Sequence, residues 1–518
     1  MLFRKNWRHC FPLLLALWLN LGDGFSQGRE QSIVILFEND VHCAIEGYTR
    51  LAGLRDAIAD TAWVAVVSSG DFLQGGPVGV LSQGEHVIGI MNSVGYDAVT
   101  LGNHEFDYKV PRLLEILPGL HAPVVCCNLR EKASGQPLFA PYVLRSYGKR
   151  KVAFIGVLTP DAMNMERYAF YDEAGKPLYD TQDTSLYRLV QRTVDAVRSE
   201  GADFVLLLSH LGEYDGGCEY SSDRLIAATT GIDALLDGHT HSVKDTVLAN
   251  LAGQPVMVAQ TGTRFSHIGK LRIGPEGGIS IDLLPITEVP YRSARVDRTV
   301  DSVNSLLAAQ TDMLVFQSEV ELAVWDEKAS EWLVRTGETN AGDLVADAIR
   351  YVGDAQIGLI NAGGIRTNLP SGAIRYGEVV SMLPFEDKVW TIEATGAEIV
   401  EAIRQNAALL PEADGSFPQV SGLRYGICLS DHSVWNVEVL QPDGTYAPLD
   451  PQAAYRVAVL DYVVTGGGLR NCFAGCNVLH ATPLLYRDAL IKFVNEQLGG
   501  IIGNTYASPQ GRITIGVQ

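Results

Sequence analysis

From residue 33 to about residue 286 the chain repeats a short apolar run, a polar loop and a stretch with helical spacing. This alternation of extended and helical periodicity predicts an α/β fold. Five apolar runs lead directly into polar loops rich in Gly, Asp, Asn and His: residues 33–37, 64–67, 98–101, 204–208 and 234–236. Because open α/β sheets bind ligands at the carboxyl ends of their strands, the five loops predict one shared site.

This alternation of extended and helical periodicity ends near residue 293. Apolar positions spaced three or four apart follow there, as on one face of a helix, at Val300, Val303, Leu306 and Leu307. A second unit begins beyond Arg335, with a helical stretch over 344–351 and strand-like runs broken by glycine turns. We therefore expect two domains, residues 27–292 and 326–518, joined by an interdomain helix within residues 293–325.

Composition agrees with two large folded domains. The chain has 518 residues, of which 47% are hydrophobic and 19% charged, which excludes a disordered protein, a collagen and a coiled coil. The net charge of -20 argues against a nucleic-acid partner or an anionic membrane surface. An anionic substrate would therefore need local cations.

Residues 1–26 resemble a signal peptide. Arg4, Lys5 and Arg8 precede an apolar run over 11–19, and small residues follow. A membrane anchor is the alternative, but the run is shorter than the ~20 residues that a spanning helix needs. We expect a secreted or periplasmic protein without a membrane span after removal of this segment.

Eight cysteines are present, and Cys10 lies in the predicted leader. The remaining number is odd, so at least one thiol should be free in a compartment that permits disulfides. Cys126 and Cys127 are adjacent, and neighbouring cysteines rarely bond to each other. We expect a disulfide within the group Cys428, Cys472 and Cys476, whose pairing the sequence leaves open.

The polar loops carry side chains that can bind divalent cations: Asp40, His42, Asp71, Asn103, His104, His210, His239 and His241. Imidazole and carboxylate ligands suit zinc, manganese and similar ions. Residues i and i+2 of an extended segment point the same way, so Asp40 with His42 could face one cavity. The two oxygens of Asp71 could bridge two cations. A single histidine after a strand is often only structural, but five such loops together favour a dinuclear site and phosphoester hydrolysis.

The ordered motifs Asn39-Asp40-Val41-His42, Gly70-Asp71, Gly102-Asn103-His104-Glu105-Phe106-Asp107, His210 and Gly238-His239-Thr240-His241 resemble the calcineurin-like metallophosphoesterases, in particular their secreted 5′-nucleotidase and UDP-sugar hydrolase branch. The resemblance implies an N-terminal four-layer αββα domain, with two mixed β-sheets flanked by helices, and a second α+β substrate-binding domain. It assigns one metal to Asp40, His42, Asp71 and His241, and the other to Asp71, Asn103, His210 and His239.

The same resemblance makes His104 and Asp107 a catalytic pair that stabilises charge on the phosphoryl group and the leaving oxygen. A carboxylate that holds a histidine fixes its tautomer and favours the cation, which suits an anionic transition state. Asp107 could instead cap the segment that follows.

In the second domain, paired glycines allow close approach of backbone to a ligand, and an adjacent arginine offers planar donors to phosphate. The resemblance places Arg335 and Arg366 at the substrate phosphate, Asn361, Gly363 and Gly364 at the nucleoside, and the Phe385 and Tyr462 rings around the base. Base stacking tolerates different bases, so a broad nucleotide preference follows. A turn at the glycines and a core position for Phe385 are the alternatives.

Two positions depart from the family pattern. Tyr462 stands where phenylalanine is common, and Gly468 stands where many relatives have an aspartate that contacts the ribose. The sugar contact is therefore missing or comes from elsewhere, such as Asp461 or Asn471.

The sequence thus predicts a secreted enzyme with two divalent metal ions that removes the 5′-phosphate from extracellular nucleotides. A UDP-sugar hydrolase or 2′,3′-cyclic-nucleotide phosphodiesterase with the same metal site is the enzymatic alternative. A nucleotide-binding protein without catalysis is the alternative of another class. The family also implies rotation of the two domains about a hinge within 293–313. Metal identity, preferred base and oligomeric state stay open.

Overall fold

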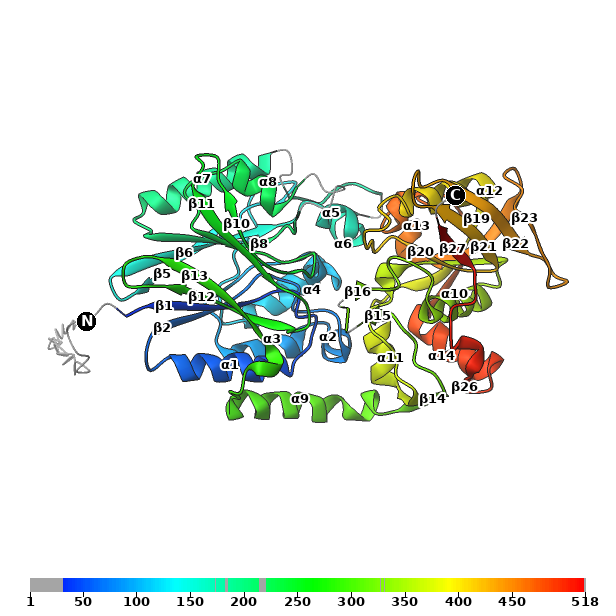
Figure 1. Ribbon diagram of the computed structural model, residues 1–518, viewed down its shortest axis with the longest axis horizontal. Helices are drawn as coiled ribbons and strands as arrows, with labels where there is room; N and C mark the ends of the chain where they lie inside the picture. The colour runs from blue at the N-terminus through cyan, green and yellow to red at the C-terminus, as the bar shows by residue number, and fades with distance from the viewer. Residues whose placement is uncertain are drawn as a thin grey trace, which may run out of the picture.

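The computed structural model describes residues 31–516 except 173, 182–184, 214–219, 327 and 330. The predicted leader over residues 1–26 lies outside this range. Two domains lie side by side, the N-terminal one on the left and the C-terminal one on the right of Figure 1. Among the described residues, none of the helices has both the length and the apolar character that a membrane crossing requires.

The N-terminal domain contains two mixed β-sheets. In the first, parallel strands β1, β2 and β3 are extended by antiparallel β12 and β13 in the order β13-β12-β1-β2-β3. Its strands are β1 (Ile33–Glu38), β2 (Trp63–Ser68), β3 (Ala98–Val99), β12 (His267–Ile273) and β13 (Ile279–Pro285). The second has the order β10-β11-β9-β8-β6-β5. Its strands are β5 (Tyr142–Tyr147), β6 (Arg150–Leu158), β8 (Phe204–His210), β9 (Ala234–Leu236), β10 (Val243–Ala249) and β11 (Pro255–Thr261).

Alternate residues of the central strands face different cores, which makes the domain four layers thick. Ile35 and Phe37 of β1 join Leu206 and Leu208 of β8 in a core between the sheets. The intervening Leu36 instead packs under the helices of the first sheet, as the period-2 geometry of a strand requires. These helices are α1 (Gly47–Ile58), α2 (Pro77–Ser82), α3 (Glu85–Val94), α4 (Lys109–Ile116) and α9 (Ala294–Thr311).

The outer face of the second sheet is covered by α7 (Leu186–Ser199) and α8 (Ser222–Ala227). Val205 and Leu207 of β8 pack there against Val190 and Val194 of α7. The short helices α5 (Ala162–Met165) and α6 (Arg167–Phe170) lie on the side of this domain that faces the second domain in Figure 1. The αββα layering expected from the resemblance is confirmed.

Helix α9 lies within the predicted linker and runs along the base of the molecule toward the second domain (Figure 1). Its buried residues Val300 and Leu307 belong to the core of the N-terminal domain, and Val303 packs against it. Leu306, by contrast, is 65% exposed, because only part of the apolar face reaches that core. The domain boundaries and the hinge stay predictions.

The C-terminal domain has a separate core, to which Leu344 of α10 and Ile360 of β17 contribute. Its main sheet has the order β20-β17-β24-β19-β25, with strands β17 (Ile357–Asn361), β19 (Lys388–Thr395), β20 (Pro418–Ser421), β24 (Ala454–Leu460) and β25 (Asn477–Leu485). A second sheet, β23-β22-β21-β27, is formed by β21 (Leu423–Cys428), β22 (Val434–Leu440), β23 (Tyr446–Pro448) and β27 (Ile513–Gly516). The helices are α10 (Asn340–Val352), α11 (Tyr376–Met382), α12 (Gly396–Asn406), α13 (Asp461–Val464) and α14 (Tyr486–Gln497).

Two small sheets complete this domain. One joins β14 (Leu314–Ser318) to β18 (Gly372–Arg375) and β26 (Ile501–Ile502). The other is a hairpin of β15 (Trp325–Asp326) and β16 (Glu331–Trp332), which lies at the boundary between the domains in Figure 1.

The cysteines do not form the predicted disulfide. Within the described part of the chain, Cys428, Cys472 and Cys476 make no disulfide with one another. Cys428 Sγ lies 3.0 Å from Ser430 Oγ, whereas Cys472 Sγ donates to Gln405 Oε1 on α12 at 3.4 Å. The expectation was wrong because these positions contact different polar side chains, which sequence spacing does not reveal. Cys126 and Cys127 are buried thiols, as expected.

Candidate metal centre

The seven predicted metal ligands all follow, or end, strands of the two N-terminal sheets. Asp40 and His42 follow β1, Asp71 follows β2 and Asn103 follows β3. In the second sheet, His210 is the last residue of β8, and His239 and His241 follow β9. The carboxyl ends of these parallel strands meet at one edge of the domain, where open α/β sheets bind ligands.

The loops that carry these ligands are strained. Five non-glycine ligands have a positive φ: Asp40 (52°), His42 (44°), Asp71 (60°), His239 (81°) and His241 (60°). Each residue in such a conformation costs about 1–3 kcal/mol, and such residues cluster at functional sites. The concentration of strain at these loops therefore supports a role beyond folding.

Each of the two aspartates uses one oxygen within the protein and leaves the other facing the histidines. Asp40 Oδ2 accepts from Asn39 Nδ2 at 2.7 Å and from the His239 backbone N–H at 2.9 Å. Asp71 Oδ1 accepts from the His104 backbone N–H at 2.9 Å. Asp40 Oδ1 and Asp71 Oδ2 remain directed at the centre of the site, as metal-binding carboxylates require.

Backbone carbonyls orient two of the histidines. His210 Nδ1 lies 2.7 Å from Ser69 O, and His42 Nδ1 lies 3.2 Å from Gln74 O. A ring nitrogen that donates to a carbonyl fixes the tautomer, so the other nitrogen, Nε2, is a lone-pair ligand. Both Nε2 atoms point at the aspartate oxygens.

The inward-facing atoms are spaced as ligands of a small cation. His241 Nε2 lies 3.3 Å from Asp40 Oδ1 and 3.1 Å from His42 Nε2. His42 Nε2 lies 3.8 Å from Asp71 Oδ2. One ligand atom from each of these four residues lies within 4.8 Å of all the others. Two imidazole lone pairs at such a separation repel unless a proton or a cation lies between them.

A second group shares Asp71. His210 Nε2 lies 3.2 Å from Asp71 Oδ2, and Asn103 Oδ1 lies 3.1 Å from His239 Nδ1. Asp40 Oδ1 and His210 Nε2 are buried, and despite these short distances the geometry gives neither atom a hydrogen bond. Buried polar atoms without partners are rare in folded proteins, so both atoms fit coordination to a metal. The residue types and their geometry thus fit two cations on either side of Asp71.

Charges at the site are strongly coupled. Burial lowers the pKa of His210, but the Asp71 and Asp40 carboxylates outweigh it and raise that pKa to about 10. Burial and the nearby His210 lower the pKa of His239 to about 4. The Asp40 and Asp71 carboxylates therefore stabilise positive charge at the centre of the site. Divalent cations would supply this charge in place of a proton on His210.

Two ligand side chains occupy space that only a glycine at the neighbouring position leaves open. A Cβ on Gly102 would lie 2.2 Å from Asp71 Oδ1, and one on Gly238 would lie 2.7 Å from His210 Nδ1. Any side chain at either position would displace a ligand. The glycines of the Gly-Asn-His and Gly-His-x-His motifs are thus explained by packing.

The predicted catalytic pair borders the ligands. His104 Nδ1 lies 3.1 Å from Asp107 Oδ2, and its ring is 5.2 Å from the ring of His42. This places the free edge of His104 beside the metal ligands with its tautomer fixed by Asp107. The Asp107 carboxylate contacts this imidazole and does not cap the segment that follows.

Glu105, for which the sequence assigned no role, holds two ligand loops together. Its buried carboxylate accepts from four backbone N–H groups: Asp71 (2.7 Å), Phe72 (2.7 Å), Leu73 (3.1 Å) and Gly102 (2.6 Å). Because these donors come from both the β2 and β3 loops, Glu105 fixes Asp71 relative to Asn103. Its place inside the Gly-Asn-His-Glu motif was the available indication.

We expect Glu105→Gln to lower the free energy of unfolding by about 2–3 kcal/mol, because an amide cannot accept all four bonds and hydrogen bonds to charged groups contribute about 1.5–3 kcal/mol. Urea denaturation measures this loss. The matched Glu115→Gln variant changes a side chain that is 68% exposed and should stay near wild type. Equal stability of the two variants would contradict the assigned role of Glu105.

Arginines of the second domain reach the metal ligands. Arg366 is 7% exposed, and its Nη2 lies 3.4 Å from His42 Nε2. Arg335 stacks on Trp332 of β16, with its guanidinium carbon 4.0 Å from the ring centre. Trp332 in turn lies 6.3 Å from the His241 ring. Sequence reasoning missed Trp332. It also missed Arg264 of the first domain, whose pKa is lowered to about 10, first by burial and then by the nearby Arg366.

The predicted aromatic residues also border the site. The Phe385 ring lies 5.6 Å from the His104 ring and is only partly buried. The Tyr462 ring lies on the glycine segment, since a Cβ on Gly467 would meet it at 2.0 Å. A Cβ on Gly468 would meet the same ring at 2.7 Å, so Tyr462 fills the space of an aspartate side chain there.

The remaining predicted substrate residues surround the end of β17. Asn361 is the last residue of this strand, and its buried Oδ1 has no hydrogen-bond partner. Gly363 donates its N–H to Gly415 O at 2.7 Å, and Gly364 O accepts from Tyr486 OH at 2.9 Å. Asp461, an alternative ribose contact, instead accepts backbone N–H groups through Oδ1, including that of Lys388.

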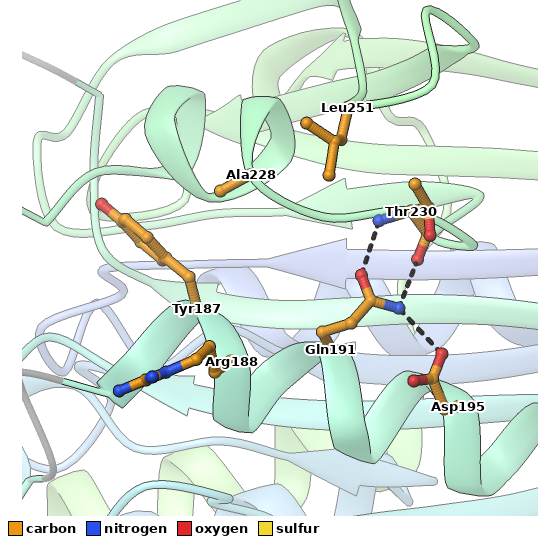
Figure 2. A pocket seen from close by; sticks show the side chains of 7 residues that line it. All are labelled: Tyr187, Arg188, Gln191, Asp195, Ala228, Thr230 and Leu251. Atoms are coloured by element: carbon orange, nitrogen blue, oxygen red, sulfur yellow. Dashed lines mark hydrogen bonds between the residues drawn. The ribbon is translucent and has the colours of Figure 1, made fainter.

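A separate open hollow of about 500 Å³ lies between α7 and α8 (Figure 2). Gln191, its central polar side chain, already bonds with Asp195 and with Thr230. This hollow offers no ligand cluster comparable to the strand-end site.

Comparisons with known proteins agree with this geometry. Residues 33–243 match the model of the calcineurin-like phosphoesterases, and residues 315–475 match that of the 5′-nucleotidase C-terminal domain. The fold and the ligand set thus define a metal-dependent phosphoesterase class. The chain belongs to the family that joins a calcineurin-like phosphoesterase domain to a 5′-nucleotidase C-terminal domain, which confirms the resemblance drawn from its motifs.

Individual relatives span both domains. The chain is 26% identical to the trifunctional nucleotide phosphoesterase protein YfkN of Bacillus subtilis over 93% of its own length, but it covers only 35% of that protein. It is 25% identical to a 5′-nucleotidase of Vibrio parahaemolyticus over 81% of this chain and 79% of the relative. The structure of a 5′-nucleotidase precursor from Thermus thermophilus superposes with a TM-score of 0.81 at 25% identity, covering 93% of this chain and 99% of that one.

Proposed function

We propose that this chain is a secreted hydrolase with two divalent metal ions that removes the 5′-phosphate from nucleotides, giving nucleoside and phosphate. The observation that carries the proposal is the 3.4 Å contact of Arg366 Nη2 with His42 Nε2. It brings an arginine of the 5′-nucleotidase C-terminal domain against a ligand of the phosphoesterase domain. A phosphate bound by that arginine therefore lies at the metal ligands.

When bound, two divalent cations such as zinc or manganese would activate a water and neutralise charge on the phosphate. The chain's own residues supply the rest of the chemistry. Asp40, Asp71 and the four histidines would hold the cations in place, and Asn103 would complete their ligand set. Arg335 and Arg366 orient the phosphate oxygens through planar donors.

His104 acts at the phosphate from the side opposite Asp107. Its Nδ1 is held by Asp107 at 3.1 Å, so Nε2 is the atom that hydrogen-bonds the substrate. A proton on Nε2 stabilises charge on the phosphoryl group and on the leaving oxygen.

The nucleoside is held by the second domain. Phe385 and Tyr462 provide faces for stacking, and Tyr486 OH links Phe385 to the paired glycines, because it accepts from the Phe385 backbone N–H and donates to Gly364 O. Because every base has a π-face, this pocket supports hydrolysis of several nucleotides.

A second candidate is a 2′,3′-cyclic-nucleotide or UDP-sugar phosphodiesterase at the same metal site. The observation that favours it is Gly468, which has no side chain where many relatives have an aspartate that contacts the ribose, and beside which the Tyr462 ring lies 2.7 Å from the place of a Cβ. The loss of that contact suits substrates in which the ribose hydroxyls are esterified or the phosphate is substituted.

Rates on AMP, 2′,3′-cyclic AMP and UDP-glucose in the presence of Mn²⁺ decide between these functions. Hydrolysis of AMP at the highest kcat/KM supports the 5′-nucleotidase. Hydrolysis of 2′,3′-cyclic AMP or UDP-glucose without hydrolysis of AMP overturns it in favour of the second candidate. Tight AMP binding without turnover of any substrate would instead identify a nucleotide-binding protein.

We expect Phe385→Ala to lower kcat/KM on AMP by a factor that corresponds to about 1–3 kcal/mol of transition-state binding. The value of kcat/KM on p-nitrophenyl phosphate should not change, because this substrate has no base to stack. Steady-state kinetics on both substrates give the comparison. Tyr291→Ala, which removes an aromatic ring that is 47% exposed, is the matched control. Equal losses on the two substrates would show that Phe385 acts as a packing residue.

A further inference from the structure

A carboxylate outside the predicted ligand loops contacts two of the functional residues. Glu166 lies at the junction of α5 and α6 and is 5% exposed. It is more than sixty positions from Asn103 in the chain, and the segment around it carries none of the motifs that predicted the site. Burial of a glutamate at such a place requires a specific partner.

The first partner is the side-chain amide of Asn103. Asn103 Nδ2 donates to Glu166 Oε1 at 3.3 Å, and its Oδ1 lies 3.1 Å from His239 Nδ1. Glu166 Oε1 accepts this bond, so it favours the orientation of the amide that turns Nδ2 toward Glu166. Asn103 Oδ1, the atom that can bind a metal, is thereby turned toward the histidine ligands.

The second partner is the adjacent His104. Its Nδ1 lies 3.8 Å from Glu166 Oε1, beside the closer contact with Asp107 at 3.1 Å. Tyr168, two residues after Glu166, donates to the backbone carbonyl of Asp107 at 3.3 Å. The α5–α6 junction thus supports both the amide ligand and the catalytic pair.

We propose that Glu166 is a positioning residue that fixes the metal-binding oxygen of Asn103 in place. The inference rests on the proposed dinuclear site and adds to it a residue that acts through Asn103 rather than on the substrate. Carboxylates that orient metal ligands contribute about 10–100-fold in metal affinity or activity.

Binding of Mn²⁺ to the metal-free protein, measured by calorimetry without substrate, tests the proposal. Glu166→Ala is expected to weaken one of the two Mn²⁺ affinities about 10–100-fold and to leave the other near wild type. Glu166→Gln keeps an acceptor oxygen for Asn103 Nδ2 and is expected to remain within about fivefold of wild type. Glu276→Ala, at an exposed position, is the control and should bind as wild type does.

A double-mutant cycle with Asn103→Ala separates positioning from a general structural effect. If Glu166 acts through Asn103, the double variant binds Mn²⁺ no more weakly than Asn103→Ala alone. Additive losses in the cycle, or wild-type affinity in Glu166→Ala, would overturn the proposal. Wild-type protein that binds no Mn²⁺ would overturn the dinuclear site itself, so the two failures are distinguishable.

Discussion

The Asp71→Asn variant is expected to lose at least about 10³-fold in kcat, while its affinity for AMP stays within about tenfold of wild type. Asp71 Oδ2 lies 3.2 Å from His210 Nε2 and 3.8 Å from His42 Nε2, between the two ligand groups. An amide lacks the negative charge that a bridge between two cations needs. The substitution leaves the proposed contacts of the nucleoside with the second domain unchanged.

Single-turnover rates and equilibrium binding of AMP measure the two quantities separately. Metal content after dialysis should fall in the same variant. Asp282→Asn, at a side chain that is 59% exposed, is the matched control and should keep both metals and turnover. Full activity of Asp71→Asn would reject the bridging role.

The strands and the order of the ligand loops could be predicted from sequence because both are local properties. The apolar runs at 33–37 and 204–208 correspond to β1 and β8, and the polar residues after them are the candidate ligands. Helix α10 likewise covers the predicted helical stretch. A strand end is recognisable from its own few residues, whichever strand it pairs with.

Contacts between distant segments could not be predicted in this way. The arrangement of two sheets came only from the resemblance to a family, since periodicity does not distinguish one sheet from two. The approach of Arg366 to His42 joins residues 324 positions apart and depends on how the domains dock. Glu166 stands in a segment with no motif, and its role follows only from its distance to Asn103.

The effect of a single position also depends on its neighbours in space. Gly468 looks like the loss of a ligand contact in the sequence, but the structure shows the Tyr462 ring in that space. An aspartate at 468 would therefore need a shift of this ring, whether position 462 carries a phenylalanine or a tyrosine.

The His104→Ala variant is expected to lose about 10²–10⁴-fold in kcat on AMP, the range for a residue that acts as a general acid. Asp107 positions the His104 ring for this role. The backbone N–H of His104 donates to Asp71 Oδ1 at 2.9 Å. The alanine variant retains that backbone bond. Binding of Mn²⁺ should therefore change little compared with the loss in rate.

The leaving group distinguishes the two roles assigned to His104. A nucleoside alkoxide needs a proton to leave, whereas p-nitrophenolate is a stable anion that leaves without one. If His104 Nε2 protonates the leaving oxygen, His104→Ala loses much less rate on p-nitrophenyl phosphate than on AMP. Equal losses would limit His104 to stabilising the phosphoryl oxygens, and an unchanged rate on AMP would remove it from catalysis. The exposed His121→Ala variant, remote from the metal ligands, controls for the loss of an imidazole.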